Sequence, residues 1–209
     1  RECKQVNTME KQRVGLEVSD EPHFFGCWDA VGGATCKALI QFFDQRQDLQ
    51  SPGRVTGGQV NTSVKDSQDI RIEPVDLELE GYEIFGDYFT VLKDCYQDYC
   101  SQWDFLNTFM TQTHIGSFNI QKYNPGGHFA EVHSERTSLT KLHRILVWMT
   151  YLNDVVEAGE TEFVHYGLKV RPRTGRTLIW PAEWTHAHRG NPTTSETKYI
   201  ITGWFNLAA

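Results

Sequence analysis

The sequence predicts an α+β fold in which helices precede a sandwich or barrel of short strands. Two segments of the N-terminal half repeat apolar residues at helical spacing, whereas the C-terminal half contains several short segments rich in β-branched and aromatic residues. Stretches with the sequences NPGG, EAG, RPRTG and RGNP separate these short segments, as turns do. Helices followed by a run of short strands are typical of an α+β chain.

The composition changes once, near residue 112, and no flexible or charged linker accompanies the change. The chain has 209 residues, which is close to the size of one domain and sufficient to bury a core. We therefore expect a single domain over 1–209, in which 1–111 provides helical and strand support and 112–209 forms the strand-rich core.

Two helices are expected in the N-terminal half, after a polar and weakly patterned start of the chain. The first has Thr35 as its expected N-cap. Its apolar face is formed by residues at helical spacing, namely Cys36, Leu39, Ile40 and Phe43. The second is expected within 75–103. Its apolar face is formed by Phe85, Tyr88, Phe89, Leu92, Cys95 and Tyr99, which we expect to be core residues rather than ligand contacts.

Between these helices, residues 50–69 are rich in Gly, Ser and Asp and predict a long loop. Long loops in compact domains are commonly either functional or disordered. Arg54, Lys65 and Arg71 lie in or beside this loop, which could be a lid that closes over a substrate or a disordered surface segment.

The strand-rich half contains five segments in which β-branched and aromatic residues predominate. These expected strands are 115–123, 144–152, 161–166, 177–180 and 198–205. Each is short and followed by turn residues, which favours a sheet sandwich or barrel over a parallel sheet.

The overall composition disfavours several functional classes. Twenty Lys and Arg against 27 Asp and Glu give a net charge of −7, whereas non-specific nucleic-acid binders usually have a basic excess. The sequence has neither an apolar run long enough to span a membrane nor an N-terminal apolar signal segment. Its five cysteines include no CxxC pair, so we expect buried thiols, Cys95 and Cys100 among them, and a cytoplasmic location.

Three features of the strand-rich half predict a metal site. In an extended segment, His133 and Glu135 would point to the same face, and the same holds for His186 and His188. Two histidines and one carboxylate that leave three coordination positions open form the facial triad of non-haem Fe(II) oxygenases. Lys198 leads a strand whose alternate residues share its face, so an anionic co-substrate could bind nearby through charge-assisted hydrogen bonds.

From residue 123 to 205, the chain resembles the prolyl 4-hydroxylase-like branch of the 2-oxoglutarate- and Fe(II)-dependent oxygenases. The resemblance is carried, in order, by YNPGGHFAEVHSE, RILVWMTYLNDVVEAGETEF, VRPRTGRTLIWP and HRGNPTTSETKYIITGW. The stretch FFGCWDAVGGATCKALIQFF is more loosely similar to the opening strand and helix of this family. The resemblance implies a double-stranded β-helix, the cupin-like jelly roll, with the N-terminal helices packed on one sheet.

The resemblance also implies roles for individual residues. It makes His133, Glu135 and His188 the iron ligands, with His186 as the competing distal ligand. It makes Lys198 the cation for the far carboxylate of 2-oxoglutarate. Further expected contacts of 2-oxoglutarate are Thr202, Tyr151 and Tyr123, and the residues that match peptide-contacting positions are Arg144 and Trp204.

Two features depart from the family pattern. Glu135 stands where the family usually has Asp, and its side chain is longer by one methylene group. The segment before His133 is also one residue longer than the common pattern, which leaves the role of His128 open.

The activity implied by the resemblance is the hydroxylation of an unactivated C–H bond with Fe(II), 2-oxoglutarate and O₂, and with ascorbate as a possible additional cofactor. A prolyl residue of a peptide or protein is the expected substrate, and a free amino acid or other small metabolite is the alternative. Neither a nucleic-acid nor a membrane partner is expected. Two other classes are considered: a non-catalytic jelly-roll binding module and, more remotely, a zinc hydrolase that uses two histidines and a glutamate.

Overall fold

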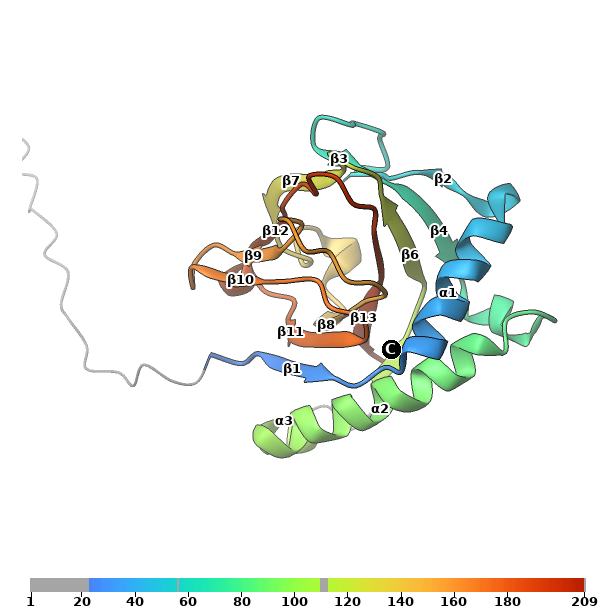
Figure 1. Ribbon diagram of the computed structural model, residues 1–209. Helices are drawn as coiled ribbons and strands as arrows, with labels where there is room; N and C mark the ends of the chain where they lie inside the picture. Colours follow the sequence, from blue (N-terminus) through green and yellow to red (C-terminus); the bar gives the residue numbers. More distant parts are fainter. Residues whose placement is uncertain (1–22, 56, 110–112, 209) are drawn as a thin grey trace, which may run out of the picture.

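Two antiparallel sheets face each other and form the jelly roll (Figure 1). The computed structural model describes residues 23–55, 57–109 and 113–208. The larger sheet contains, in chain order, β1 (Gly26–Asp29), β2 (Ser51–Pro52), β4 (Gln68–Ile72), β5 (Thr113–Ile115), β6 (Phe118–Tyr123), β8 (Arg144–Tyr151), β11 (Arg176–Pro181) and β13 (Lys198–Leu207). The smaller sheet contains β3 (Lys65–Asp66), β7 (His128–His133), β9 (Thr161–Phe163), β10 (Leu168–Val170) and β12 (His188–Gly190).

The spatial order of the strands brings distant parts of the sequence together. The larger sheet runs β1-β11-β8-β13-β6-β4-β2, with β5 paired to β13, and the smaller sheet runs β10-β9-β12-β7-β3. The long strand β13 lies between β6 and β8, where Lys198 pairs with Tyr123 and Ile200 pairs with Tyr151. The N-terminal half therefore contributes strands to both sheets in addition to its helices.

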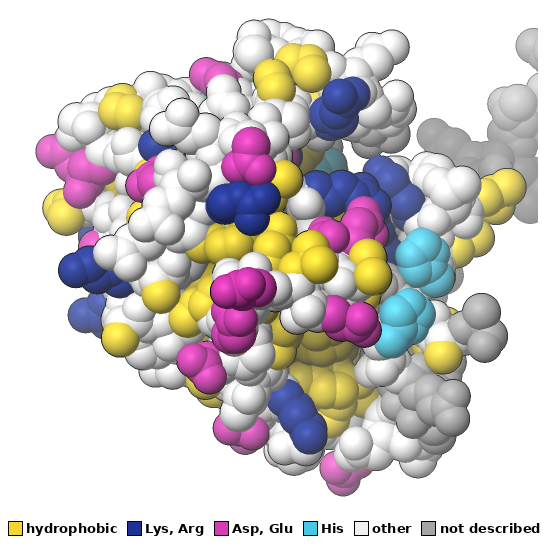
Figure 2. Space-filling model, turned by 90° about the vertical axis from the view of Figure 1, so that its right-hand side faces the viewer, with side chains coloured by type: hydrophobic (Ala, Val, Ile, Leu, Met, Phe, Trp, Pro, Cys, Tyr) yellow, Lys and Arg dark blue, Asp and Glu magenta, His cyan; other side chains and the backbone are white. Residues whose placement is uncertain are grey.

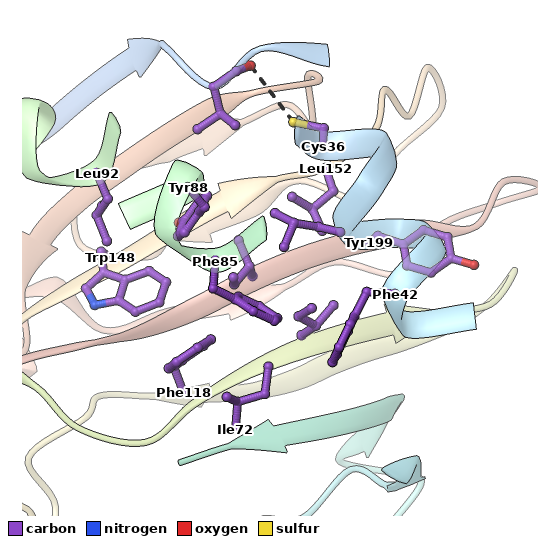
Figure 3. Packing of buried hydrophobic residues seen from close by; sticks show 14 of the residues in the cluster. Cys36, Phe42, Ile72, Phe85, Tyr88, Leu92, Phe118, Trp148, Leu152 and Tyr199 are labelled. Carbon is purple, nitrogen blue, oxygen red and sulfur yellow. Dashed lines mark hydrogen bonds between the residues drawn. The ribbon is translucent and has the colours of Figure 1, made fainter. Parts of the chain in front are cut away.

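The helices cover the face of the larger sheet that points away from the smaller sheet (Figure 1). They are α1 (Gly33–Gln45), α2 (Ile84–Gln102) and the short α3 (Phe105–Phe109). Figure 3 shows residues of α1 and α2, such as Phe42, Phe85 and Tyr88, packed against Phe118 and Trp148 of the sheet. This apolar layer buries one face of the larger sheet, and the opposite face of the sheet lines a cavity.

The first helix begins earlier than the sequence predicts. Gly32, and not Thr35, is the N-cap, so the prediction of Thr35 as the cap is wrong. The backbone N–H groups of Ala30 and Val31, just before the helix, both donate to the Gly175 carbonyl, 3.1 Å away. Gly175 has a φ of +79°, and an added Cβ would lie 1.9 Å from the Val31 oxygen, so only glycine fits there.

The predicted loop over 50–69 and the predicted helix over 75–103 are each longer than the observed elements. Strands β2, β3 and β4 take both ends of the loop, which leaves 53–64 as the connection. The second helix starts only at Ile84, because Pro74–Glu78 form a 3₁₀ turn with a capping box between Glu73 and Asp76. The other short 3₁₀ turns are η1 (Gln47–Leu49), η3 (Leu139–Lys141) and η4 (Trp184–His186).

The surface is mixed in character. Figure 2 shows acidic and basic side chains interspersed with hydrophobic ones, and Lys and Arg side chains beside a hollow in the upper part of this face. Within the described ranges, no helix is both long enough and apolar enough to cross a membrane. Cys27, Cys36, Cys95 and Cys100 are free thiols, the last three of them buried, as predicted for Cys95 and Cys100; Cys3 lies outside the described residues.

Candidate active site

A cavity of about 710 Å³ lies between the two sheets and is lined by most of the site residues that the sequence predicts. The smaller sheet and the segment after it contribute His133, Glu135 and His188, and the larger sheet contributes Lys198 and Arg144. The remaining predicted residues that line the cavity are Tyr123, Tyr151, Thr202 and Trp204.

His133, Glu135 and His188 form the only cluster with metal-binding geometry among the described residues, with ligand atoms within 4.8 Å of one another. His133 ends β7 and pairs directly with His188, which begins β12. The Nε2 atoms of both histidines lie 3.7 Å from the same carboxylate oxygen, Oε1 of Glu135. Glu135 reaches this point from the bend after β7 and not from the strand itself.

The backbone fixes which nitrogen each histidine offers. Nδ1 of His133 donates to the Glu131 carbonyl at 2.8 Å, and Nδ1 of His188 donates to the His186 carbonyl at 3.0 Å. A carbonyl oxygen can only accept, so Nδ1 carries the proton and Nε2 keeps its lone pair. Both lone pairs then face the carboxylate, as they would have to in order to share one metal ion.

The local electrostatics favour the ligand forms of these side chains. Burial, together with the neighbouring His133, lowers the pKa of His188 to about 4, so its imidazole is neutral at physiological pH. Burial alone raises the pKa of the Glu135 carboxyl, but its interactions with His133, His188 and Arg144 bring this pKa below its usual value. A neutral imidazole beside an ionised carboxylate is the donor set that a divalent cation requires.

Two further interactions hold the segment that carries Glu135. Its backbone N–H donates to the Ala182 carbonyl at 3.1 Å, and the next side chain, Arg136, forms an ion pair with Glu183. Residues 182 and 183 precede η4 and β12, so these contacts join Glu135 to the segment that leads to His188. Within β7, the Phe129 ring stacks on the His133 ring at 3.8 Å between centroids.

Strand β7 contains a bulge just before His133. Between the pairs His188–His133 and Gly190–Phe129, β12 advances by two residues and β7 by four. Despite the bulge, His133 lies opposite His188. His128 lies at the start of β7, where its Nδ1 donates to the Gly126 carbonyl, and it is not part of the metal cluster.

His186 points away from the cluster. It belongs to the 3₁₀ turn η4, where its Nε2 lies 2.9 Å from the His23 carbonyl and its ring packs against Phe25 and Tyr166. An extended segment would place both histidines on one face, and it was the family resemblance that favoured His188 over His186. The turn breaks this alternation and brings only His188 into the cluster.

The opposite end of the cavity holds a buried cation. Lys198 is 3% exposed, and its Nζ donates to the Gly159 carbonyl at 2.8 Å. Its ammonium lies 4.8 Å from the centroid of the Tyr123 ring, and within the described ranges it has no carboxylate in salt-bridge contact. Burial lowers the pKa of Lys198 to about 8, which indicates a cation that an anionic ligand would stabilise.

The hydroxyl groups expected to bind 2-oxoglutarate are already engaged within the protein. Tyr151 donates to Thr161 Oγ1 at 2.6 Å, and Thr202 donates to the Trp148 carbonyl at 2.9 Å. Tyr123 donates to Gln121 Oε1 at 2.7 Å. The structure thus places these residues in the cavity wall, while their direct contact with a ligand stays a prediction.

A buried polar cluster lies beside Tyr123 and was not predicted from the sequence. Lys65 Nζ lies 2.5 Å from Asp69 Oδ2, and Ser67 Oγ donates to Asp69 Oδ1 at 2.7 Å. Gln121 links Asp69 to Tyr123 through hydrogen bonds of 3.3 and 2.7 Å. Lys65 and Ser67 lie in a polar stretch that resembles a solvated loop, and no local pattern in the sequence indicates that they are buried.

The three ligand side chains fit a resident Fe(II) ion. Both histidines present Nε2, a single carboxylate faces them, and the cavity continues beside them, which leaves room for further ligands. Imidazole and carboxylate are suitable donors for Fe(II), and a facial arrangement of three protein ligands is the pattern of non-haem iron oxygenases.

Comparison with known proteins agrees with this chemistry. Residues 118–206 match the family model of the 2OG-Fe(II) oxygenase superfamily. Procollagen-lysine,2-oxoglutarate 5-dioxygenase 1 of Gallus gallus is 27% identical over 160 residues, which cover 73% of this chain and 19% of that protein. A probable prolyl 4-hydroxylase 9 of Arabidopsis thaliana is 29% identical over 123 residues, which cover 46% of this chain and 43% of that protein. The chain therefore spans less than half the length of these relatives.

Solved structures share the fold. A prolyl-4-hydroxylase from Pseudomonas putida superposes with a TM-score of 0.67 at 16% sequence identity, over 90% of this chain and 94% of that one. A prolyl hydroxylase from Trichoplax adhaerens, in complex with a peptide fragment of a hypoxia inducible factor, has a TM-score of 0.67 at 17% identity, over 87% of this chain and 83% of that one. At this level of identity, the likeness confirms the jelly-roll fold and the arrangement of helices on one sheet.

Proposed function

We propose that the protein is a 2-oxoglutarate- and Fe(II)-dependent dioxygenase that hydroxylates an unactivated C–H bond of a peptide or protein substrate, in keeping with the match of residues 118–206 to the family model of the 2OG-Fe(II) oxygenase superfamily. The observation that carries this proposal is the position of His133, Glu135 and His188 at one point of a cavity whose other end holds Lys198. Fe(II), 2-oxoglutarate and O₂ together supply the oxidising chemistry, in which one oxygen atom enters the substrate C–H bond and the other enters succinate, with release of CO₂.

The cavity residues have distinct tasks in this proposal. His133, Glu135 and His188 hold the metal ion. Lys198 binds the far carboxylate of 2-oxoglutarate, since within the described residues its buried ammonium is hydrogen-bonded to carbonyl oxygens only and forms no salt bridge. Tyr123 and Tyr151 pair with Lys198 and Ile200, Thr202 follows further along β13, and all three line the same cavity; their exchange of a protein partner for the ligand is part of the proposal.

The apolar wall of the cavity excludes water from the reacting atoms. Met149, Val147 and Ile200 line it, and Trp180 packs edge-on against the His188 ring at 5.2 Å between centroids. A dry, low-dielectric pocket strengthens the interaction between Lys198 and a carboxylate and protects a reactive oxidant from side reactions.

A prolyl residue in a peptide is the proposed substrate. Two findings support a peptide: the structural neighbour from Trichoplax adhaerens contains a peptide fragment, and the relative from Gallus gallus carries the name of a procollagen-lysine dioxygenase. The second relationship makes a lysyl residue the alternative to test, alongside a free amino acid.

Succinate formation by the purified protein, loaded anaerobically with Fe(II) and then exposed to O₂, tests this proposal. Matched peptides that differ only by Pro or Lys at the central position, free proline and free lysine form the substrate arms. We expect iron-dependent succinate that the Pro peptide stimulates and that His133→Ala abolishes. Stimulation by the Lys peptide or by a free amino acid would identify that molecule, and not a prolyl residue in a peptide, as the substrate. Absence of succinate together with absence of Fe(II) binding would contradict the activity itself and favour a non-catalytic binding module.

A further inference from the structure

The glutamate in the metal cluster has two oxygen atoms with different partners. Oε1 of Glu135 faces both histidines, 3.7 Å from each Nε2, whereas Oε2 accepts a hydrogen bond from Nη1 of Arg144 at 3.1 Å. A glutamate side chain has one more rotatable bond than an aspartate. Without a second contact it could turn or offer both oxygens to a metal ion, as carboxylates often do.

Arg144 is itself held in place. It begins β8, and its guanidinium carbon lies 3.4 Å from the centroid of the Trp204 ring on the neighbouring strand β13. Its side chain is only 17% exposed, and Glu135 is its one carboxylate partner in the described part of the chain. A planar guanidinium stacked on an indole has a fixed plane, so its N–H groups point in a fixed direction.

We propose that Arg144 is a positioning residue for Glu135, which it holds through Oε2 so that only Oε1 is offered to the metal ion. This inference rests on the proposed function, since it concerns the same metal site. A single bound oxygen keeps three coordination positions open, as the facial triad requires. In this interpretation, Arg144 and Trp204 compensate for the longer side chain of glutamate, whereas the family resemblance alone would make both of them substrate contacts.

Two opposing effects make the proposal testable by metal affinity. A guanidinium near a divalent cation repels it, so if Arg144 acted only as a charge, its removal would strengthen metal binding. If Arg144 orients Glu135, its removal should weaken metal binding instead. Outer-sphere partners of metal ligands typically contribute about 10- to 100-fold to metal affinity, and we expect a loss in that range for Arg144→Gln.

The experiment is a titration of the metal-free protein with Co(II), without 2-oxoglutarate or substrate, followed by the visible absorption of the bound ion. Arg144→Gln is compared with wild type, and the same change is made in Glu135→Asp, whose shorter carboxylate withdraws from Arg144. We expect the loss of affinity in the Glu135 background and a change within about twofold in the Asp background, because the two residues act as one unit. Arg71→Gln is the matched control: Arg71 also lines the cavity but bonds to Glu73 and Ser117.

Three results would overturn the proposal: unchanged or tighter Co(II) binding by Arg144→Gln, an equal loss in both backgrounds, or an equal loss in Arg71→Gln. If Arg144→Gln does not fold, as judged by circular dichroism, Arg144→Lys takes its place. Lysine keeps the charge but lacks the planar fork, so a loss of affinity in this variant supports orientation and an unchanged affinity contradicts it. Since Co(II) binding needs no turnover, a wild type that binds metal but forms no succinate would refute the proposed activity and leave the role of Arg144 intact.

Discussion

The two sheets of the jelly roll contribute to the cavity in different ways. The larger sheet is covered by helices on one side, and its strands β8 and β13 are buried for most of their length. The smaller sheet has short strands, and β7 exposes Ala130, Glu131 and Val132. The rigid sheet supplies the buried Lys198 and the apolar wall, whereas the less buried sheet supplies both histidines. Substitutions at the metal end should therefore lower the free energy of unfolding less than substitutions at the Lys198 end.

The largest expected effect is at the metal end. His133→Ala removes one of three ligands and should abolish iron-dependent succinate formation altogether. Because the His133 side chain is 19% exposed and makes one hydrogen bond, the midpoint of urea unfolding should remain close to that of wild type. A variant that retains turnover would show that the metal is held elsewhere.

Removal of the ion pair that joins the sheets should give the largest loss of stability. Lys65 on β3 of the smaller sheet pairs with Asp69 on β4 of the larger sheet, and both are buried. Lys65→Met leaves the Asp69 carboxylate buried without its cation, at a cost of about 3–5 kcal/mol in the free energy of unfolding. Urea unfolding measures this loss, with Asp29→Asn at the exposed pair with Arg176 as the control, for which about 0–1 kcal/mol is expected.

A double variant sharpens this second prediction. If the cost of Lys65→Met comes from the unpaired carboxylate, Lys65→Met combined with Asp69→Leu should recover a large part of it. A double variant that is less stable than Lys65→Met would show that Ser67 and Gln121, which also bond to Asp69, matter more than the charge pair.

At the Lys198 end, the expected effect is on 2-oxoglutarate binding. Lys198→Ala removes a charge-assisted contact of roughly 1.5–3 kcal/mol, which corresponds to roughly a 10- to 150-fold rise in the dissociation constant. Isothermal titration with 2-oxoglutarate on the Co(II)-loaded protein measures it. An unchanged dissociation constant would mean that another group binds the far carboxylate.

The smallest effect is a pH dependence of 2-oxoglutarate binding. The pKa of Lys198 in the free protein is about 8, with Glu160 as a nearby carboxylate that raises it and burial as the larger cause that lowers it. A bound carboxylate raises this pKa, so binding takes up a proton above pH 8. The affinity should be constant below about pH 8 and fall up to tenfold per pH unit above it. In Lys198→Arg the cation does not titrate in this range, and the fall should disappear.

The same pKa has a consequence for the stability of the ligand-free protein. Because the pKa of Lys198 is lower in the folded chain than in the unfolded chain, the unfolded chain binds more protons between about pH 8 and pH 10.5. The contribution of Lys198 to the free energy of unfolding is therefore unfavourable below pH 8 and improves as the pH rises through that window.

Much of the fold could be predicted from the periodicity and composition of the sequence. The helix faces around Cys36 and Tyr88 have clear periodicity, and each of the five segments predicted as strands in the C-terminal half contains strand, although 115–123 is divided between β5 and β6 and 161–166 ends at Phe163. Strands β2, β3, β10 and β12 have two or three residues each, which is too few to show a pattern, and the first three of them lie at sheet edges. Their formation depends on tertiary pairing and not on local propensity.

The sequence predicted which residues form the site but not the contacts that they make with one another. The motifs around His133, His188 and Lys198 led to residues that line one cavity. The resemblance favoured His188 over His186, but the physical reason, the 3₁₀ turn η4 that carries His186 away from the cluster, is not visible in a two-residue periodicity. The pairing of Arg144 with Glu135 joins the start of β8 to the bend after β7, nine positions earlier, and nothing in their local sequence indicates it.

Equilibrium binding of Fe(II) under anaerobic conditions, compared between His188→Ala and His186→Ala, tests the central claim most directly. The structure places the first side chain in the metal cluster and the second in a contact with the His23 carbonyl. We predict that wild type and His186→Ala each bind one Fe(II) per chain and that His188→Ala binds none. Retention of iron by His188→Ala together with its loss from His186→Ala would contradict the account of the active site.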